Sequence, residues 1–338
     1  MLFAVVSGPR RNVPAVAVVL SALGLVLLLS SGAPARAAVP SCRVGAYVAA
    51  IYDVDPGHNA FSARLDVWSL CPRADLDPIP NMLFSNGYEP AKSNPVTTTS
   101  KGVYRHLTVV DGKFRQGWNL KDFPFDRHDI DIVFTSSRDD SQFRFEADDR
   151  NSAYDSGTSV PGWKVTGMRL AVLDHRFVTN FGDPTLPPGS GIGYSRLNVR
   201  ISLERDVAFT LFWQLISPIV MVFVITSLTF LLSDPNANFF QSRLGVLGAS
   251  VFTVLLSMNK VDASLPPDSG LNLIDELHLL VLGYVLLGVC IAVAGWLMVV
   301  RGYAEATIRR LSRAGFVSGM VGCAGGGVLL TLVTASGY

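Results

Sequence analysis

The sequence has few charged residues and no excess of either sign. Lysine and arginine number 28 against 27 aspartates and glutamates, and charged residues make up only 16% of the 338 positions. Proteins that bind nucleic acid through charge usually carry a clustered basic excess. The balance here gives no evidence of that kind, and we expect no nucleic-acid partner.

Motifs that carry chemistry are also missing. The sequence has no CxxC pair, no glycine loop that would cradle phosphate, and no nucleophile with an evident partner. Its 5 histidines lack metal-ligand spacing, and His278 could sense protons or merely hydrogen-bond a neighbour. Asp139-Asp140 and Asp148-Asp149 could supply oxygen ligands to calcium, but such pairs are more often solvated loop charges. We therefore expect no enzyme, no cofactor and no metal site.

Cysteine is scarce, and its 4 residues fall in two unlike settings. Cys290 and Cys323 lie in apolar segments, where we expect them to pack as small apolar side chains. Cys42 and Cys71 lie in the polar half. If the strands that follow Cys42 and precede Cys71 form a hairpin, the two cysteines face each other and could form a disulfide in an oxidising compartment.

In place of charge the sequence has long apolar segments. Residues 209–232 hold no charge, residues 277–300 carry only His278, and residues 314–338 have no charged side chain. About 20 such residues cross a hydrocarbon core. Residues 243–263 are interrupted by Lys260, which favours a place inside a bundle or beside water. We expect a transmembrane domain over residues 206–338, with four helices at about 209–232, 243–263, 275–300 and 314–337.

The N-terminus and the charges predict an orientation. Arg10 and Arg11 precede an apolar run, and Ala35-Arg36-Ala37 offers a small-residue cleavage site. This is typical of a secretory signal peptide over residues 1–37, with a transmembrane anchor as the alternative. Export would place residues 38–205 and the C-terminus outside the cytoplasm. Residues 301–313 would then be cytoplasmic, and their arginines agree with the positive-inside rule for a multi-pass cell-membrane protein.

Residues 38–205 show short strand patterns and almost no helical periodicity. The expected strands are residues 43–52, 61–70, 104–110, 129–134, 142–146, 163–174 and 196–204. Strands at this spacing fit an all-β, immunoglobulin-like antiparallel sandwich. Residues 148–161 and 181–193 are expected to be long surface loops.

The stretch FPFDRHDIDI, residues 123–132, lies between these halves. An aromatic residue before proline favours a cis bond and a tight turn, with Asp126 directly after it. Alone, this would fit a hairpin corner in any β-domain. In this chain the turn is followed by Arg205 just before the first span, by Pro218 within that span, and by Ala263-Ser264-Leu265-Pro266 at the end of the second.

This order of features resembles the pentameric ligand-gated ion channels, the Cys-loop receptor superfamily, over roughly residues 44–337. The cysteines that flank the turn in animal receptors would fall at Gln116 and Ile130. Residues 301–313 are too short for a cytoplasmic domain. The missing cysteines and the short loop make the chain resemble the bacterial members of the family. The resemblance therefore implies a protein of the bacterial inner membrane.

In the second span, a set of residues recurs at alternating four- and three-residue steps and so shares one helix face. These residues, the predicted pore stripe, are Gly245, Ala249, Phe252, Leu256, Asn259 and Ala263. The resemblance implies that such stripes line a central pore, with Phe252 and Leu256 as apolar rings that could gate by dewetting. Close helix packing explains Gly245 and Ala249 equally well.

Charge selectivity stays open. Gln241-Ser242-Arg243 matches neither the glutamate of cation-selective relatives nor the Pro-Ala-Arg of anion-selective ones. Lys260 and Asp262 would add rings of opposite sign.

For coupling between the halves, the resemblance places Asp126, Arg205 and one of Asp53 or Asp55 together just above the membrane. A partly desolvated arginine there favours carboxylate partners. Beside them, the loop of residues 265–273, which contains Pro266, would act as a stiff lever. A solvated surface ion pair is the alternative.

The resemblance also implies an agonist site between subunits. Its expected residues are Asp66, Trp68, Arg138, Phe177 and Tyr194, with Ser137 beside Arg138. Amine-binding members use an aromatic cage, but Ser136 and Ser137 stand where one aromatic residue would be. Arg138 with Tyr194 would suit a carboxylate instead. Alternatively, the aromatic residues are ordinary sandwich surface and core.

Two functions follow from these expectations. One is a ligand-gated ion channel subunit, opened by a small-molecule agonist. The other is a membrane receptor of the same architecture that conducts poorly and signals through a partner. The expected partners are the agonist, permeant inorganic ions, the lipid membrane and further copies in a homopentamer.

Overall fold

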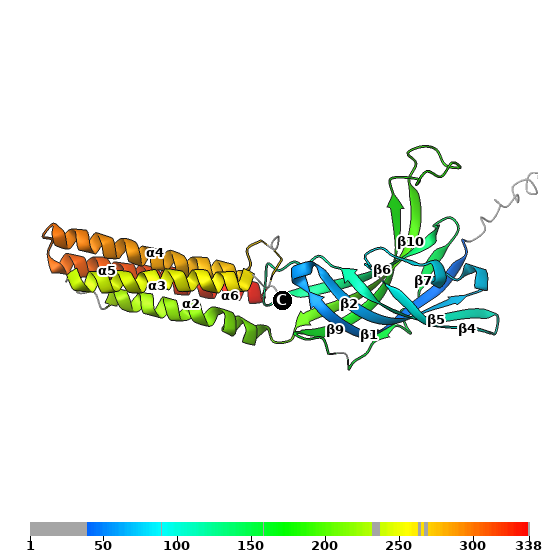
Figure 1. The fold of residues 1–338 in the computed structure, drawn as a ribbon, viewed down its shortest axis with the longest axis horizontal. Helices are drawn as coiled ribbons and strands as arrows, with labels where there is room; N and C mark the ends of the chain where they lie inside the picture. The colour runs from blue at the N-terminus through cyan, green and yellow to red at the C-terminus, as the bar shows by residue number, and fades with distance from the viewer. Residues whose placement is uncertain are drawn as a thin grey trace, which may run out of the picture. The chain divides into compact units, whose positions relative to one another are not determined.

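The computed structural model describes residues 39–88, 90–157, 159–231, 237–262, 265–266 and 270–336, and the chain from Pro40 onward forms one compact unit. The expected signal peptide and Ala263 lie outside the described residues. Within them, a β-rich region is followed by helices long and apolar enough to cross a membrane (Figure 1).

The described part of the β-rich region contains two sheets. The first has the order β4-β5-β2-β1-β7 with β8 paired to β1, and the second has the order β3-β6-β10-β9. The strands are β1 (Ser41–Asp55), β2 (Ala60–Cys71), β3 (Leu83–Phe84), β4 (Ala91–Ser100), β5 (Val103–Arg115), β6 (Arg127–Asp139), β7 (Arg144–Ala147), β8 (Ala153–Tyr154), β9 (Trp163–Phe177) and β10 (Ile192–Arg205).

Alternating burial along the strands builds the core between these sheets. In β10, Leu197, Val199 and Ile201 are buried, as strand periodicity requires for a half-buried sheet. Phe84 of the second sheet contacts Phe114 of the first, with ring centroids 6.1 Å apart. Burying each such side chain contributes about 1.5–3 kcal/mol.

The first hairpin forms with the expected pairing. β1 and β2 are antiparallel, and Arg43 lies opposite Leu70, so that Cys42 and Cys71 fall side by side. The structure joins them in a disulfide whose Cα atoms are 4.6 Å apart. Both cysteines are buried in the core.

Strand β4 lies where no strand was expected. Its sequence, AKSNPVTTTS, is polar and contains a proline, and all its residues are exposed. Proline is tolerated at a sheet edge because no neighbour needs its missing N–H. The register shifts between Ser93 and Val96, and Asn94 has φ of 52°, so a bulge accommodates the irregular sequence.

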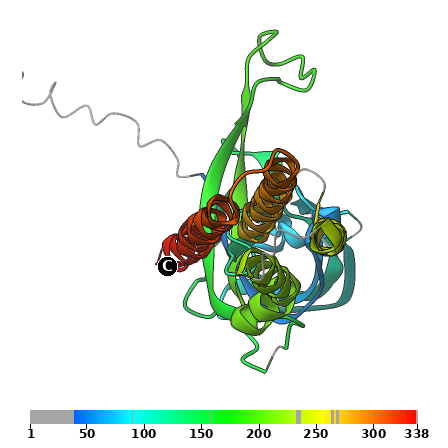
Figure 2. The ribbon, with the colours of Figure 1, turned by 90° about the vertical axis from the view of Figure 1, so that its left-hand side faces the viewer.

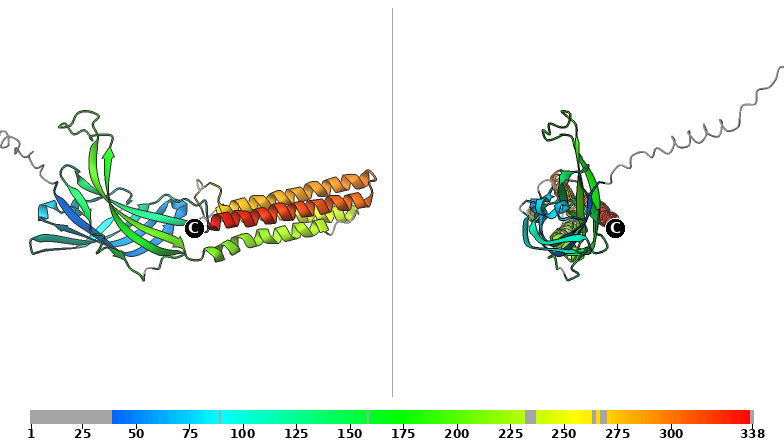
Figure 3. Two further views of the ribbon diagram at one scale, coloured as in Figure 1. Left: turned by 180° about the vertical axis from the view of Figure 1, so that it is seen from behind. Right: turned by 90° about the vertical axis from the view of Figure 1, so that its right-hand side faces the viewer.

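The described part contains four candidate membrane spans. They are α2 (Ala208–Leu231), α3 (Ala237–Asp262), α4 (Leu273–Val300) and a last helical run made of α5 (Glu305–Gly319), a π-helical stretch (Met320–Gly325) and α6 (Gly326–Ser336). Figure 2 looks along the bundle and shows α3 and α6 on opposite sides of it, and Figure 3 shows the same helices from behind.

Three helices begin earlier than the apolar runs do. Helix α3 begins at Ala237 rather than Arg243, and α5 begins at Glu305 rather than Ala314. Charged and polar residues limit the part of a helix that can lie in the hydrocarbon core, but the helix itself can continue through them. In α5, Arg309 pairs with Glu305 one turn away at 2.9 Å, which stabilises that polar turn. Helix α4 begins at Leu273 because Asn272 and Asp275 form a capping box.

The last helix packs closely through two glycines one turn apart. A Cβ atom on Gly319 would come within 1.7 Å of the Tyr284 ring, and one on Gly315 within 2.4 Å of Ile291. Small residues at this spacing allow close contact between membrane helices.

Candidate functional site

Arg205 closes β10 at the end of the sheet that leads into α2. Its Nε donates to Asp126 Oδ1 at 2.5 Å, and its guanidinium lies over the rings of Trp163 and Phe123 at 4.3 and 4.7 Å. Arg205 lies opposite Trp163 in the β-ladder, and the Phe123-Pro124 bond is cis, as the sequence predicts. The side chains of Arg205 and Asp126 are only 13% and 1% exposed, so this is no solvated surface pair.

Asp126 accepts a second hydrogen bond on its other oxygen, from His128 Nε2 at 2.6 Å. Burial alone would raise the pKa of Asp126, but the hydrogen bonds from His128 and Arg205, with the charges of both, hold the pKa below its ordinary 3.8. The Asp126 carboxylate is therefore ionised at neutral pH and holds both partners.

The two aspartates of the β1–β2 turn do not join this cluster. Asp55 accepts from the backbone N–H and the ring of His58, at 3.1 and 2.7 Å, and caps the short turn of Pro56–His58. Asp53, at a φ of 48°, has no ion pair with Arg205 among the described residues. Neither aspartate therefore forms an ion pair with Arg205 in the part of the chain that the structure describes: turn hydrogen bonds hold Asp55, and the rings of Trp163 and Phe123 lie over Arg205.

The turn that carries Asp126 also contacts the helices. The Phe125 ring lies 5.4 Å from the ring of Phe212 in α2. The Leu273 N–H at the start of α4 donates to the Lys121 carbonyl at 3.1 Å. Leu265 and Pro266, in the loop between α3 and α4, are buried. One loop of the β-region thus contacts two helices beside the buried ion pair.

Helix α3 has two unlike faces. The described members of the predicted pore stripe, Gly245, Ala249, Phe252, Leu256 and Asn259, are all exposed, Phe252 to 64% and Leu256 to 53%. The opposite face, which includes Leu247, Ser250 and Val254, is buried. The stripe is therefore not used in packing within its own chain.

A histidine of α4 helps to hold the buried face of α3. His278 is fully buried, and its Nδ1 donates to the Ile274 carbonyl at 2.7 Å, since a carbonyl can only accept. Its Nε2 bonds to the Ser257 hydroxyl of α3 at 2.8 Å. These bonds hold α3 against α4, and the predicted pore stripe stays exposed.

A pocket lies on the second sheet at the base of the β9–β10 hairpin. This hairpin pocket has a volume of about 520 Å³ and is lined by Leu83, Phe84, Ser85, Thr135, Ser136, Ser137, Phe177, Phe181, Tyr194 and Arg196. The ring of Phe177 lies 5.1 Å from that of Phe181 and 5.7 Å from that of Tyr194, edge to face. Phe177, Tyr194 and Ser137 of the expected agonist site thus meet in one pocket.

The other residues expected there lie elsewhere. Arg138 is not in the pocket lining, and its Nη2 donates to the Asp75 carbonyl at 2.5 Å. Asp66 and Trp68 lie on β2 of the first sheet. Trp68 donates to Asp148 at 2.9 Å and packs so closely on Gly45 that a Cβ atom there would come within 2.4 Å of the indole.

Sequence reasoning missed Phe181 and Arg196, and it also missed the pocket residues Leu83, Phe84, Ser85 and Thr135. Arg196 lies two positions after Tyr194, and its guanidinium lies over the Phe177 ring at 5.4 Å. Alternation along β10 places both side chains on the same face of the sheet, but it does not show that a pocket forms there. Phe181 lies in the loop that follows β9, where no periodicity applies.

No protein-family model and no curated protein matches this chain.

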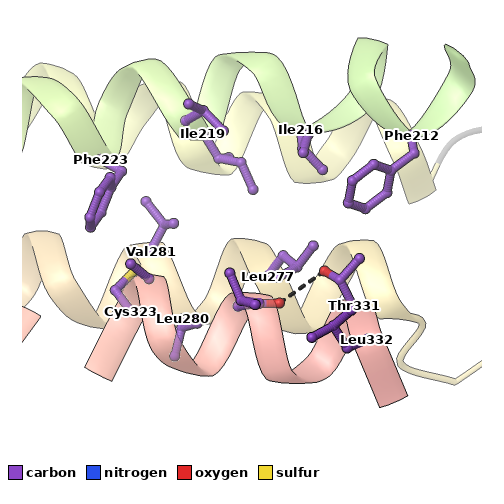
Figure 4. Close-up of a pocket in the computed structure, with 14 residues that line it drawn as sticks. Phe212, Ile216, Ile219, Phe223, Leu277, Leu280, Val281, Cys323, Thr331 and Leu332 are labelled. Carbon is purple, nitrogen blue, oxygen red and sulfur yellow. Dashed lines mark hydrogen bonds between the residues drawn. The ribbon is translucent and has the colours of Figure 1, made fainter. Parts of the chain in front are cut away.

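A second cavity, of about 400 Å³, lies among the helices and is apolar. Figure 4 shows Phe212, Ile216, Ile219 and Phe223 of α2 facing side chains of α4 and of the last helix, including Leu277 and Leu332. The hydroxyl of Thr331 is bonded to the Gly327 carbonyl of its own helix at 2.9 Å. These walls suit an apolar molecule and offer nothing to a charged one.

Over the described residues, no three or more His, Cys, Asp or Glu side chains gather where they could hold a metal.

Proposed function

We propose that this protein is a subunit of a ligand-gated ion channel, a homopentamer of the cell membrane whose central pore is lined by α3. The observation that carries the proposal is the exposure of the stripe from Gly245 to Asn259 while the opposite face of α3 is packed. The proposed agonist site is the hairpin pocket, on an exported immunoglobulin-like sandwich.

The chemistry of the exposed stripe favours water over lipid on that side. Asn259 and Lys260 are exposed near the end of α3, and the small residues Gly245 and Ala249 are exposed near its beginning. Polar groups in a membrane helix are stable when they face a bundle interior or a water-filled path. Copies of α3 around a common axis would provide that path, with Phe252 and Leu256 as its narrow apolar part.

The buried Asp126–Arg205 pair supports a coupling role for the junction. It holds the turn whose Phe125 and Lys121 contact α2 and α4, and α4 in turn holds α3 through His278. A displacement of the β-region would therefore be passed to the pore helix through bonded neighbours. Because the pair is buried, Arg205→Ala in an assembled channel should remove or shift agonist-evoked current.

The test is planar-bilayer recording of the purified protein, with native mass spectrometry of the same sample to count subunits. A polar residue in an apolar gate favours hydration, so Phe252→Ser should produce agonist-independent current. Leu286→Ser is the matched control, because Leu286 is an exposed apolar residue of α4. A monodisperse pentamer whose Phe252→Ser variant carries no more current than the control would contradict the channel.

The second candidate is a receptor of the same architecture that conducts poorly and signals through a partner. The apolar character of the most exposed stripe residues, Phe252 and Leu256, favours it, because an apolar constriction resists ions. The same recordings separate the two: a receptor of this kind binds ligand and assembles, yet stays silent even with Ser at position 252.

A further inference from the structure

Arg196 lies on the central part of the second sheet, and its side chain reaches the hairpin pocket. It pairs with Thr135 of β6 on one side and Leu173 of β9 on the other. Its guanidinium lies over the Phe177 ring at 5.4 Å. Its Nε–H is buried and has no hydrogen-bond acceptor in the part of the chain that the structure describes.

The charge of Arg196 is also uncompensated. Arg200, on the same strand, is held by both oxygens of Asp131 at 2.8 and 3.0 Å, and Arg205 is held by Asp126. No carboxylate lies within ion-pair distance of Arg196 among the described residues. Burial lowers the pKa of Arg196 below its ordinary value, but an arginine still stays protonated at neutral pH. A partly buried guanidinium in this state is stabilised by any anion that reaches it.

The other residues that line the hairpin pocket determine which chemical groups the anionic ligand can have besides its charge. Phe177, Phe181 and Tyr194 present rings at 5.1 to 6.4 Å from one another, which suits an apolar body. Ser136 and Ser137 bring hydroxyl groups to the same space. A volume of about 520 Å³ accommodates a small molecule and little more.

We propose that the hairpin pocket binds a small carboxylate with an uncharged apolar body, and that Arg196 is the residue that recognises the carboxylate. A plain amine is disfavoured, because Arg196 already occupies a face of Phe177 and its charge repels a second cation. The inference rests on the proposed function only in taking this pocket as the agonist site. Arg196 thus replaces Arg138 in the sequence-based expectation.

Binding is tested by titration calorimetry on the purified full-length protein, without any current measurement. The probes are benzoate and phenylacetate, with benzylamine as the amine of matched size. Both carboxylates should bind and benzylamine should not. Arg196→Gln should weaken benzoate binding by at least about tenfold, because a charge-assisted hydrogen bond is lost.

Two further variants make the result interpretable. Arg176→Gln removes the same charge from the same hairpin, where the exposed Arg176 bonds the Gly191 carbonyl, and should leave benzoate binding unchanged. Phe181→Ala removes an exposed wall of the pocket and should weaken benzoate while leaving the fold intact. Melting temperatures equal to that of the parent protein show that each variant is folded.

Three outcomes would overturn the inference: neither carboxylate binds, benzylamine binds more tightly than benzoate, or Arg196→Gln and Arg176→Gln have equal effects. Its failure is separable from that of the channel. Benzoate binding that depends on Arg196 in a protein that never conducts overturns the channel alone. Current evoked by another ligand, unaffected by Arg196→Gln, overturns the carboxylate site alone.

Discussion

At the scale of single residues, the buried carboxylate of Asp126 makes the stability of the protein depend on pH. Its pKa is held below 3.8 in the folded protein, so the unfolded chain binds the proton more tightly. The stabilisation is therefore complete above the unfolded value of about 3.9 and is lost as pH falls through the folded pKa. We predict that the melting temperature, measured in steps from neutral pH downward, falls steeply only below about pH 4.

The variant Asp126→Asn should remove this acid sensitivity and destabilise the protein at neutral pH. Removing one partner of a buried pair typically costs about 3–5 kcal/mol, because the other charge stays buried. Asp75→Asn is the control, since Asp75 pairs with Arg73 in solvent. Equal melting temperatures for the two variants at neutral pH would show that the buried pair contributes nothing particular.

Single residues also show where sequence reasoning reaches its limit. Asp126 and Arg205 could be selected because the FPFD turn and the start of the first span mark them. Arg196 could not, because an arginine in an alternating strand suggests a solvent-facing side chain. Whether a carboxylate faces it depends on the register of neighbouring strands, which one sequence does not determine.

At the scale of elements, α3 has a narrow buried side, which includes Leu247, Ser250 and Val254, and a broad exposed side that contains the predicted pore stripe. With Cys290 and Cys323 replaced by alanine, cysteines placed at positions 249, 252 and 256 should react with a water-soluble thiol reagent. Cysteines at positions 247, 250 and 254 should not, because those side chains are buried against the chain's own helices. Mass spectrometry of the labelled protein gives the reaction rates, and equal rates on both faces would contradict a water-lined stripe.

The last helix offers a matched pair of glycines. A side chain at Gly319 would collide with the Tyr284 ring, whereas nothing lies within 4 Å of a Cβ atom on Gly322. We predict that Gly319→Val lowers stability by about 1–3 kcal/mol through overpacking, and that Gly322→Val does not. Thermal melting in detergent, followed by size-exclusion chromatography, measures this; a Gly322→Val protein that melts at the same reduced temperature would contradict it.

Elements were predictable where periodicity is strong. The β1–β2 hairpin, with Cys42 opposite Cys71, and the existence of the apolar helices follow from patterns of burial and length. Strand β4 and the start of α5 do not, because one is a polar edge strand with a proline and the other is a charged helical turn. Edge strands and helix ends outside the hydrocarbon region carry no hydrophobic signal.

At the scale of the whole molecule, the contact between Phe125 and Phe212 joins the β-region to α2. If ligand occupancy is passed along this contact, Phe125→Ala should shift the half-activating concentration of an agonist. An aromatic pair is worth about 0.5–1.5 kcal/mol, which corresponds to a shift of about twofold to tenfold. Ligand binding by calorimetry should stay unchanged, which separates coupling from affinity.

The control for this prediction is Phe209→Ala, which removes an exposed ring from the same helix. If both variants shift the agonist response equally, the effect belongs to α2 in general rather than to its contact with the β-region.

The turn between α4 and α5 bears on how the protein can be labelled. It is short, and Gly302, at a φ of 74°, lets the Arg301 and Tyr303 amides bond back to the carbonyls of Leu297 and Met298 at 3.1 and 3.0 Å. An insertion here would break those bonds and separate two packed helices. A fluorescent reporter should therefore be better tolerated in the exposed loop between β9 and β10, around Thr185, where an insertion would break only bonds within that loop and separate no packed helices.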